Sequence, residues 1–345
     1  MDWKKHASDA TKYCMQTFWD ADARRFRPAS PVVSGELPWD FMWGNGVVFS
    51  MLVGAARLDN RAYRSYIIAF FRGLEGYWGR DSRPPGYDAY LSQGGGDKYY
   101  DDNAWMALTF AEAYRVTNDK RLWLRADETL RYVLSGWDEN RGGGICWRED
   151  RKSKNTCANA PSAVAVLATI TPDNRTERIE WARRIVAWTQ QNLQDPVDGL
   201  YFDNITVATG TVEKTKWTYN TALMVRAHLD LWRLTKNKTD RDEAVRLAEA
   251  SEKTFVVPET GAFRDDALFS HLLVEAFVLL WRETKLPWLK ARAETNGVFV
   301  ATRPKLPDGG YGESWCTPNT APGQRKALMA NAATARLFWC LAHLA

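Results

Sequence analysis

The chain has 345 residues, of which 45% are hydrophobic and 26% are charged, and its formal net charge at pH 7 is +4. This length and apolar content suffice for a sizeable buried core. Basic residues are interleaved with acidic ones, so the sequence has no basic stripe of the kind that binds nucleic acid or a membrane surface. Its 17 Trp, 13 Tyr and 14 Phe are residue types that stack on sugar rings and that also dominate protein cores.

Cysteines and the N-terminus give little sign of a special environment. The five cysteines show no CxxC pair or other metal-binding spacing. They are Cys14, Cys146, Cys157, Cys316 and Cys340. We interpret them as buried or half-buried residues and expect neither a metal nor a cofactor. The first residues lack the apolar core of a signal peptide, and no run of about 18 uncharged apolar residues occurs. We therefore expect a soluble protein, either cytoplasmic or exported with its signal removed.

Two kinds of helical segment alternate along the chain. The first kind is charged on one face, as in helices at a protein surface. These segments are 4–18, 61–73, 120–134, 176–193, 240–253 and 287–295. The second kind is apolar on nearly every face, as in buried helices. These segments are 42–58, 103–116, 158–170, 220–234, 267–282 and 327–344.

The apolar segments recur at roughly fifty to sixty residues, which indicates a repeated architecture. Each follows a loop rich in turn residues and aromatics. Six inner and six outer helices that alternate in this way predict an all-α fold, the (α/α)6 barrel, as one domain over residues 1–345. The loops that enter the inner helices would then share one end and one cleft. Strand signals are short, as at 199–203, and predict small hairpins in these loops.

Asp101 and Asp102 stand where the pair Tyr99-Tyr100 gives way to the second apolar segment. Because aspartate and asparagine are good N-caps, we expect this helix to start near Asp102 and several other apolar helices to start at a similar cap. Two adjacent carboxylates at a helix N-terminus suit acid and nucleophile chemistry, since like charge and the helix dipole separate their pKa values. They suit ordinary capping equally well.

Five segments, in the right order, resemble glycoside hydrolase family 76, which consists largely of endo-α-1,6-mannanases. They are 100–105 (YDDNAW), 135–138 (SGWD), 142–147 (GGGICW), 154–160 (KNTCANA) and 217–220 (WTYN). The resemblance covers most of the chain. It implies that Asp101 is the nucleophile and Asp102 the general acid/base of a retaining mechanism. It also implies Gln-Gly after Asn220, where this chain has Thr221-Ala222.

Other residues are candidates for binding sugar. Aromatic side chains on or beside the cleft loops can stack on sugar rings or pack in the core. They are Trp39, Trp43, Tyr100, Trp147, Trp217 and Tyr219. Asparagines near inner-helix starts can bind hydroxyl groups or cap the helix. They are Asn155, Asn159 and Asn220. Asp265 in the fifth unit can pair with Arg264, cap its helix or bind a sugar hydroxyl, and the structural roles are favoured.

We predict a monomeric glycoside hydrolase that cleaves α-1,6-linked mannose chains, with an oligo- or polysaccharide substrate and no nucleic-acid or membrane partner. Because the (α/α)6 barrel hosts many chemistries, two alternatives stay open. One is another enzyme of this fold, such as an unsaturated glycuronyl hydrolase or a sugar epimerase. The other is a glycan-binding protein without turnover. An epimerase needs histidines as proton carriers, and the positions of His228 and His271 inside apolar segments disfavour it.

Overall fold

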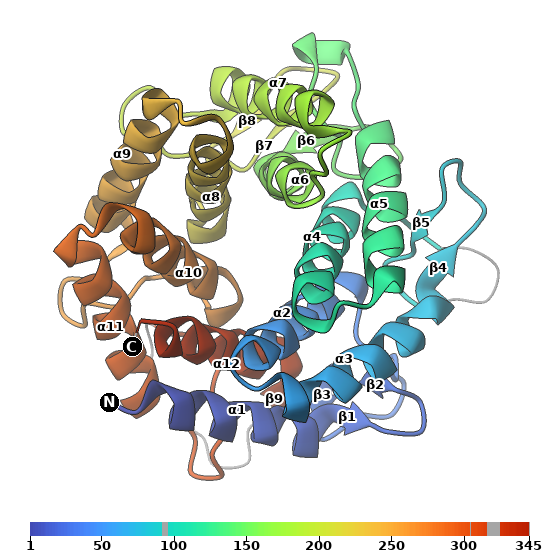
Figure 1. The fold of residues 1–345 in the computed structure, drawn as a ribbon, viewed down its shortest axis with the longest axis vertical. Coiled ribbons are helices and arrows are strands. Elements are labelled where there is room, and N and C mark those ends of the chain that lie inside the picture. The colour runs from blue at the N-terminus through green and yellow to red at the C-terminus, as the bar shows by residue number, and fades with distance from the viewer. Residues whose placement is uncertain (92–95, 304, 316–324, 345) are drawn as a thin grey trace. The chain divides into compact units, whose positions relative to one another are not determined.

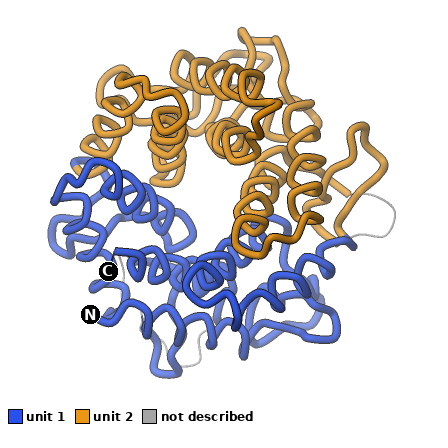
Figure 2. The backbone as a smooth tube through the Cα atoms, viewed as in Figure 1, with its two compact units in different colours: residues 1–76, 253–345 blue, residues 77–252 orange. Residues whose placement is uncertain are grey.

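The computed structural model describes residues 1–91, 96–303, 305–315 and 325–344. Cys316 and the predicted loop residues Gly94 and Gly95 lie outside these ranges. The chain divides into two compact units, residues 1–76 with 253–345 and residues 77–252 (Figure 2). Our expectation of one domain over residues 1–345 stays a prediction.

The first unit is built on three apolar helices, with α12 packed between α2 and α10 (Figure 1). These helices are α2 (Met42–Leu58), α10 (Ala267–Thr284) and α12 (Leu328–Ala342). Charged helices cover them: α1 packs on α12, α3 on α2 and α11 on α10. Their bounds are Trp3–Phe18, Asn60–Leu74 and Pro287–Thr302. Two antiparallel strand pairs complete the unit, β1 (Trp19–Asp20) with β2 (Arg25–Phe26) and β3 (Ala29–Ser30) with β9 (Lys326–Ala327).

The second unit repeats this arrangement, with α6 packed between α4 and α8. The three helices are α4 (Tyr100–Thr117), α6 (Thr156–Ala168) and α8 (Thr218–Thr235). The charged helices α5 (Lys120–Ser135) and α7 (Arg175–Leu193) pack on α4 and α6. Helix α9 (Lys238–Phe255) crosses the boundary between the units. The strands, all antiparallel, are β4 (Trp78–Gly79) with β5 (Gly86–Tyr87), and the sheet β6 (Ser153–Asn155), β7 (Asn204–Thr206) and β8 (Val212–Glu213).

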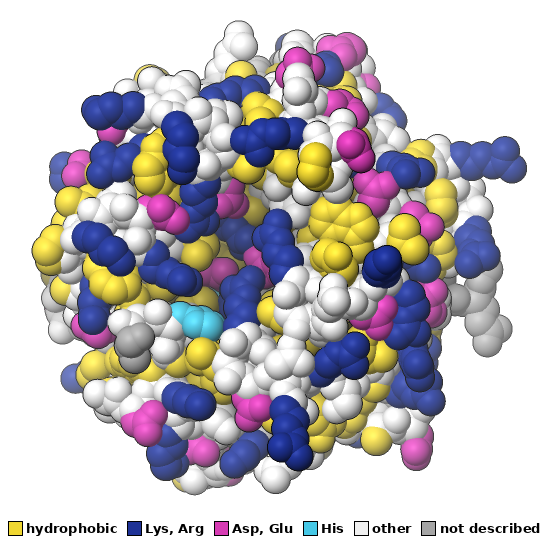
Figure 3. Space-filling model, viewed as in Figure 1, with side chains coloured by type: hydrophobic (Ala, Val, Ile, Leu, Met, Phe, Trp, Pro, Cys, Tyr) yellow, Lys and Arg dark blue, Asp and Glu magenta, His cyan; other side chains and the backbone are white. Residues whose placement is uncertain are grey.

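Burial follows the two kinds of sequence pattern. Every residue of α6 is buried, whereas α5 buries one stripe that includes Leu122, Ala126 and Leu130. Charges of both signs are interspersed over the face shown in Figure 3. No helix in the described ranges is both long enough and apolar enough to cross a membrane. The packing of charged helices on buried apolar ones shows that the predicted alternation of inner and outer helices is present within each unit.

The apolar helices do not start at side-chain caps, so our capping prediction is wrong. Each is preceded by an extended residue whose side chain makes no capping hydrogen bond. Helix α4 begins at Tyr100 rather than near Asp102, because the Tyr100 amide donates to the Trp147 carbonyl oxygen at 2.9 Å. Asp101 and Asp102 consequently lie inside the first turn.

A polar residue stands at the fourth position of each apolar helix and bonds to main chain that precedes the helix. These residues are Asn45, Asn103, Asn159, Thr221, Ser270 and Asn331. Asn103 shows the pattern most clearly: its Oδ1 accepts from the Tyr87 amide at 2.7 Å, and its Nδ2 donates to the carbonyl oxygens of Tyr87 and Tyr99 at 3.0 and 2.8 Å. Asn159 and Asn331 bind Ile145 and Tyr311 in the same way. The loop that precedes each of these three helices is thereby fixed against its first turn.

Helix α11 is longer than predicted, running to Thr302 instead of residue 295. The pair Asn296-Gly297 looks like a helix end in the sequence. In the structure, the buried Asn296 accepts from the Phe263 amide at 2.9 Å. A Cβ on Gly297 would lie 2.2 Å from Leu341 and 2.8 Å from Trp3, so glycine allows the helix to pack closely here.

Candidate active site

Three consecutive apolar helices of the second unit place their second residues together. These residues are Asp101 on α4, Cys157 on α6 and Tyr219 on α8. The Cys157 sulfur lies 3.4 Å from Asp101 Oδ2, and the Tyr219 hydroxyl is hydrogen-bonded to the Cys157 sulfur. The equal helix register and the packing of α6 between α4 and α8 explain this convergence.

The Asp101 carboxylate accepts three hydrogen bonds. Its Oδ1 accepts from the Asp102 amide at 2.9 Å, and its Oδ2 accepts from Trp147 Nε1 at 2.9 Å and from the Cys157 thiol. Burial raises the pKa of Asp101 to about 6, while these three bonds act in the opposite direction. Asp102 is itself buried, with 7% of its surface exposed. The site thus holds the Asp101 carboxylate, whose pKa is about 6, beside the buried Asp102 carboxylate.

Trp147 is fixed by its main chain and leaves much of its ring exposed. Its amide donates to the Ser153 carbonyl oxygen at 2.9 Å, and its carbonyl oxygen accepts from Tyr100. Its ring meets Tyr99 edge-on with the centroids 5.0 Å apart. With 36% of its surface exposed, Trp147 can hold Asp101 through Nε1 and still offer a face to a ligand.

A third carboxylate, that of Asp203, lies beyond Cys157 and Tyr219. Its main chain is bonded to the start of α6 through the Thr156 amide, at 2.8 Å, and to the Glu213 carbonyl oxygen at 3.0 Å. Burial raises the pKa of Asp203, and the side chains of Asn204 and Asn220 oppose that rise. Sequence reasoning missed both Cys157 and Asp203 as site residues.

The other predicted residues of this unit are placed differently. Tyr100 is buried and stacks on Tyr132 with a centroid separation of 5.0 Å, so its ring is not available to a sugar. Asn159 is fully buried, and its amide is used by the main chain of Ile145 and Asn155. The remaining candidates lie at the starts of α6 and α8. They are the buried Asn155 and Asn220 and the half-buried Trp217.

Three predicted binding residues lie in the first unit. Trp39 is half-buried, and the guanidinium groups of Arg25 and Arg27 lie 5.9 and 6.0 Å from its ring centroid. Trp43, the second residue of α2, stacks on Phe269 at 5.7 Å. Asp265 lies 3.8 Å from Arg264, and Asp266 rather than Asp265 precedes α10. Of the roles that we considered for Asp265, the ion pair with Arg264 is therefore present.

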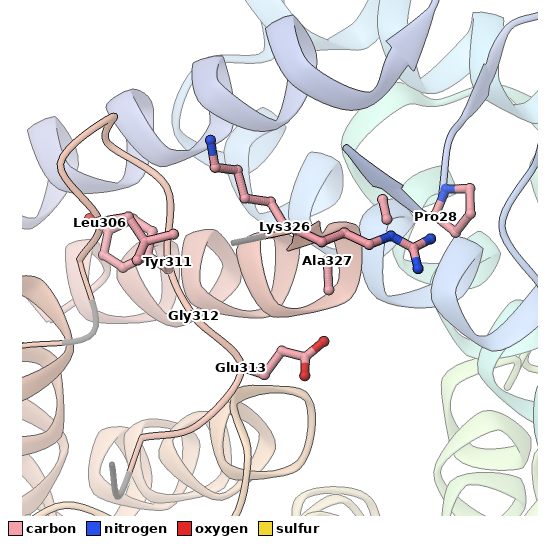
Figure 4. A pocket seen from close by; sticks show the side chains of 9 residues that line it. Pro28, Leu306, Tyr311, Gly312, Glu313, Lys326 and Ala327 are labelled. Atoms are coloured by element: carbon pink, nitrogen blue, oxygen red, sulfur yellow. The ribbon is translucent and has the colours of Figure 1, made fainter. Parts of the chain in front are cut away.

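The first unit also has a pocket of about 390 Å³ beside the start of α12 (Figure 4). Glu313 points into it, and the ring of Tyr311 lies on its wall. Its two cationic residues already hold carboxylates, since Arg325 pairs with Glu36 and Lys326 with Asp308. This pocket has no group that identifies a ligand.

The two histidines inside apolar helices, His228 and His271, have polar partners within their own units. His228 is buried, with Nδ1 3.4 Å from Asp240 Oδ1 and Nε2 3.4 Å from Gln190. His271 has Nδ1 3.0 Å from the Ala267 carbonyl oxygen, and burial lowers its pKa to about 4. Neither ring is placed to carry protons for an epimerase. Among the described residues, no group of three or more His, Cys, Asp or Glu side chains could hold a metal ion.

The fold is that of known carbohydrate-active α/α barrels. An α-mannanase of Bacteroides thetaiotaomicron has a TM-score of 0.93 at 22% identity, covering 100% of this chain and 96% of that one. An inactive variant of an α-1,6-mannanase from a Salegentibacter species, solved with α-1,6-mannotriose, has a TM-score of 0.86 at 22% identity over 100% of both chains. These likenesses confirm the predicted (α/α)6-barrel fold class.

The amino-acid sequence shows to which family within this fold class the chain belongs. The family model of glycosyl hydrolase family 76 matches residues 2–320, and the chain belongs to that family. The meiotically up-regulated gene 191 protein of Schizosaccharomyces pombe is 28% identical over 244 residues, which are 64% of this chain and 53% of that protein. The match therefore spans about half the length of this curated relative. The family resemblance expected from the motifs is confirmed.

Proposed function

We propose that this protein is a retaining glycoside hydrolase of α-1,6-linked mannose chains, with Asp101 as nucleophile and Asp102 as general acid/base. The observation that carries the proposal is the Asp101 carboxylate, held by three donors in the first turn of α4 beside Asp102. Donors and the helix N-terminus favour the ionised form that a nucleophile needs. A pKa of about 6 leaves Asp101 ionised at neutral pH.

The reaction proceeds in two displacements. Asp101 attacks the anomeric carbon while Asp102 protonates the leaving glycosidic oxygen, which gives a glycosyl ester on Asp101. Asp102, now ionised, then takes a proton from water as the water attacks the same carbon and releases Asp101. Adjacent side chains suit this mechanism because retaining enzymes keep their two carboxyl groups about 5 to 5.5 Å apart.

The substrate class is supported by two structures of one relative. The Salegentibacter α-1,6-mannanase is inactive in variants in which two neighbouring aspartates are replaced, and these variants were solved with α-1,6-mannotriose and α-1,6-mannotetrose. In our proposal Trp147 stacks on a sugar ring, and a second group of residues completes the binding site of a monomeric enzyme. That group is Asn155, Trp217 and Asn220 of the second unit, and sugar binding by Trp39, Trp43 and Asp265 of the first unit stays a prediction. Tyr100 and Asn159 support the site without touching the sugar.

Product release from a linear α-1,6-mannooligosaccharide tests this function. The wild type should shorten the substrate, whereas Asp101→Asn and Asp102→Asn should each lose about three or more orders of magnitude in kcat. The matched control is Asp173→Asn, which changes an exposed carboxylate in the turn between α6 and α7 and should leave kcat unchanged. Circular dichroism verifies that all four proteins are folded.

Two outcomes would contradict the proposal. Binding of the oligosaccharide without any product from the wild type would indicate a glycan-binding protein instead. Cleavage that survives in both Asp101→Asn and Asp102→Asn would place the chemistry elsewhere.

A further inference from the structure

Cys157 is a buried thiol that the two-displacement mechanism does not itself require. We propose that Cys157 and Tyr219 are positioning residues of the nucleophile, forming a relay from the Tyr219 hydroxyl through the Cys157 thiol to Asp101 Oδ2. The inference rests on the proposed role of Asp101 as nucleophile. It adds that Cys157 and Tyr219 keep the Asp101 carboxylate ionised and hold it in one orientation. Neither residue is proposed to touch the sugar, since Cys157 acts through the Asp101 carboxylate and Tyr219 acts through Cys157.

The geometry of the relay comes from helix register. All three residues occupy the second position of an apolar helix, and α6 with Cys157 lies between α4 with Asp101 and α8 with Tyr219. The thiol therefore fills the space between the carboxylate and the phenol. Its sulfur is 3.4 Å from Asp101 Oδ2, within the range of a hydrogen bond that involves sulfur.

The direction of each bond follows from the protonation states. Burial, with the nearby charges of Asp101 and Asp203, raises the pKa of the Cys157 thiol well above its usual range. Burial also raises the pKa of Tyr219 well above its usual range. Both groups consequently keep their protons at neutral pH. Tyr219 donates to the sulfur, and the thiol donates its own proton to Asp101.

The relay is one of several influences on Asp101, and these surround it from different elements. Asp102 follows on α4, Trp147 donates from the loop before β6, and Cys157 faces it from α6. Tyr219 on α8 and Asp203 before β7 lie behind the thiol. The nearby Arg148 is turned away, since it bonds to the Tyr99 hydroxyl and pairs with Asp150 at 2.9 Å.

The relay matters because burial opposes ionisation of the carboxyl group. Each donor on Asp101 stabilises its charged form and so lowers its pKa from the value that burial alone would give. Replacing Cys157 by a residue without a hydrogen-bond donor should raise the pKa of Asp101 by about 0.5 to 1 unit, the range expected for one modest hydrogen bond. A cysteine that only filled space would leave this pKa unchanged.

The experiment measures the titration of Asp101 directly and through activity. Protein labelled with ¹³C at the aspartate carboxyl carbon is titrated by NMR, and the signal absent from Asp101→Asn identifies Asp101. The acid limb of the profile of kcat/KM against pH is measured on the α-1,6-mannooligosaccharide. The variants are Cys157→Ala, Cys157→Ser and Tyr219→Phe. Cys146→Ala is the matched control, since Cys146 is also a buried free cysteine of this unit.

The relay predicts a pattern that a loss of packing cannot produce. Cys157→Ala should raise the Asp101 midpoint and the acid limb by about 0.5 to 1 pH unit, and Tyr219→Phe by less. Cys157→Ser should restore both because serine keeps a donor, and Cys146→Ala should change neither. An unshifted midpoint in Cys157→Ala, or an equal shift in Cys157→Ser, would overturn the proposal. If the wild type cleaved nothing, the proposed function would fail, but the NMR titration would still test whether Cys157 and Tyr219 act on Asp101.

Discussion

Replacing Asn103 should be among the most damaging single changes in the second unit. Its amide makes three hydrogen bonds to the main chain of Tyr87 and Tyr99, and it is fully buried directly after Asp102. Asn103→Ala removes these bonds, each of about 1 kcal/mol, and takes the Asn103 acceptor from the buried Tyr87 amide at a further cost of about 1 to 3 kcal/mol. The free energy of unfolding should therefore fall by about 4 to 6 kcal/mol.

Urea unfolding at 25 °C, followed by tryptophan fluorescence, measures this loss as a lower midpoint at unchanged slope. The matched control is Asn192→Ala on α7, where the half-buried amide makes one bond to a carbonyl oxygen one turn earlier. That change should cost less than about 1 kcal/mol. If Asn103→Ala were no more costly than Asn192→Ala, the assignment of Asn103 as the element that fixes its loop would be refuted.

Three further predictions concern charge and burial around the site. Burial raises the pKa of Asp101 from 3.8 to about 6, so the folded state binds this proton more tightly than the unfolded state does. The stabilisation of the folded state that results is fully present below pH 3.8 and is lost as the pH rises through 6. Asp101→Asn should thus raise the unfolding free energy at pH 7.5 by about 1 to 3 kcal/mol, with no gain near pH 4, in parallel urea titrations. Lys154 is fully buried and donates to three carbonyl oxygens of residues 138–143, so Lys154→Met should cost about 3 kcal/mol or more in thermal unfolding. Lys152→Met, with a side chain 82% exposed, should cost less than about 0.5 kcal/mol. Trp147→Phe keeps a ring against Tyr99 but loses the Nε1 donor, and should raise the acid limb of kcat/KM by about one pH unit, whereas an unmoved limb would show that this donor does not tune Asp101.

Hydrophobic pattern predicts the helices well because it records which faces are buried. Helix α2 runs from Met42 to Leu58 as expected, and the other apolar helices lie within a few residues of their predicted bounds. The largest error, at the end of α11, arises where tertiary contacts override local preference. Asn296 and Gly297 favour a helix end by themselves, but a bond to Phe263 and close packing on Trp3 continue the helix.

The start of α4 shows why the details of the site escape the sequence. Asp101 and Asp102 resemble caps locally, yet the chain enters the helix two residues earlier because Tyr100 is bonded to a loop that lies far away in the sequence. The sequence does contain a signal for the pairing of Asp101 with Cys157. Each residue stands two positions before the recurring polar residue, Asn103 or Asn159, and aligning the repeats on these asparagines would have placed Asp101 and Cys157 at the same level.

The repeat also explains which binding predictions lost their role. An asparagine near the start of an apolar helix can face a ligand or its own loop, and composition does not distinguish the two. Asn159 occupies the fourth position of α6 and is used by the main chain of Ile145 and Asn155. Asn220 occupies the third position of α8 and lies beside Asp203 instead. A difference of one position in the helix therefore separates Asn159, which supports its own loop, from Asn220, which is a candidate for contact with a ligand.

The anomeric form of the first product tests the central claim most directly, because the claim is that Asp101 forms a covalent glycosyl ester. Proton NMR spectra recorded within the first minutes of cleavage of an α-1,6-mannooligosaccharide report the new reducing end before it mutarotates. The account predicts that the α-anomer appears first and the β-anomer grows in only later. Initial release of the β-anomer would show a single inverting displacement by water and would contradict a nucleophilic role for Asp101.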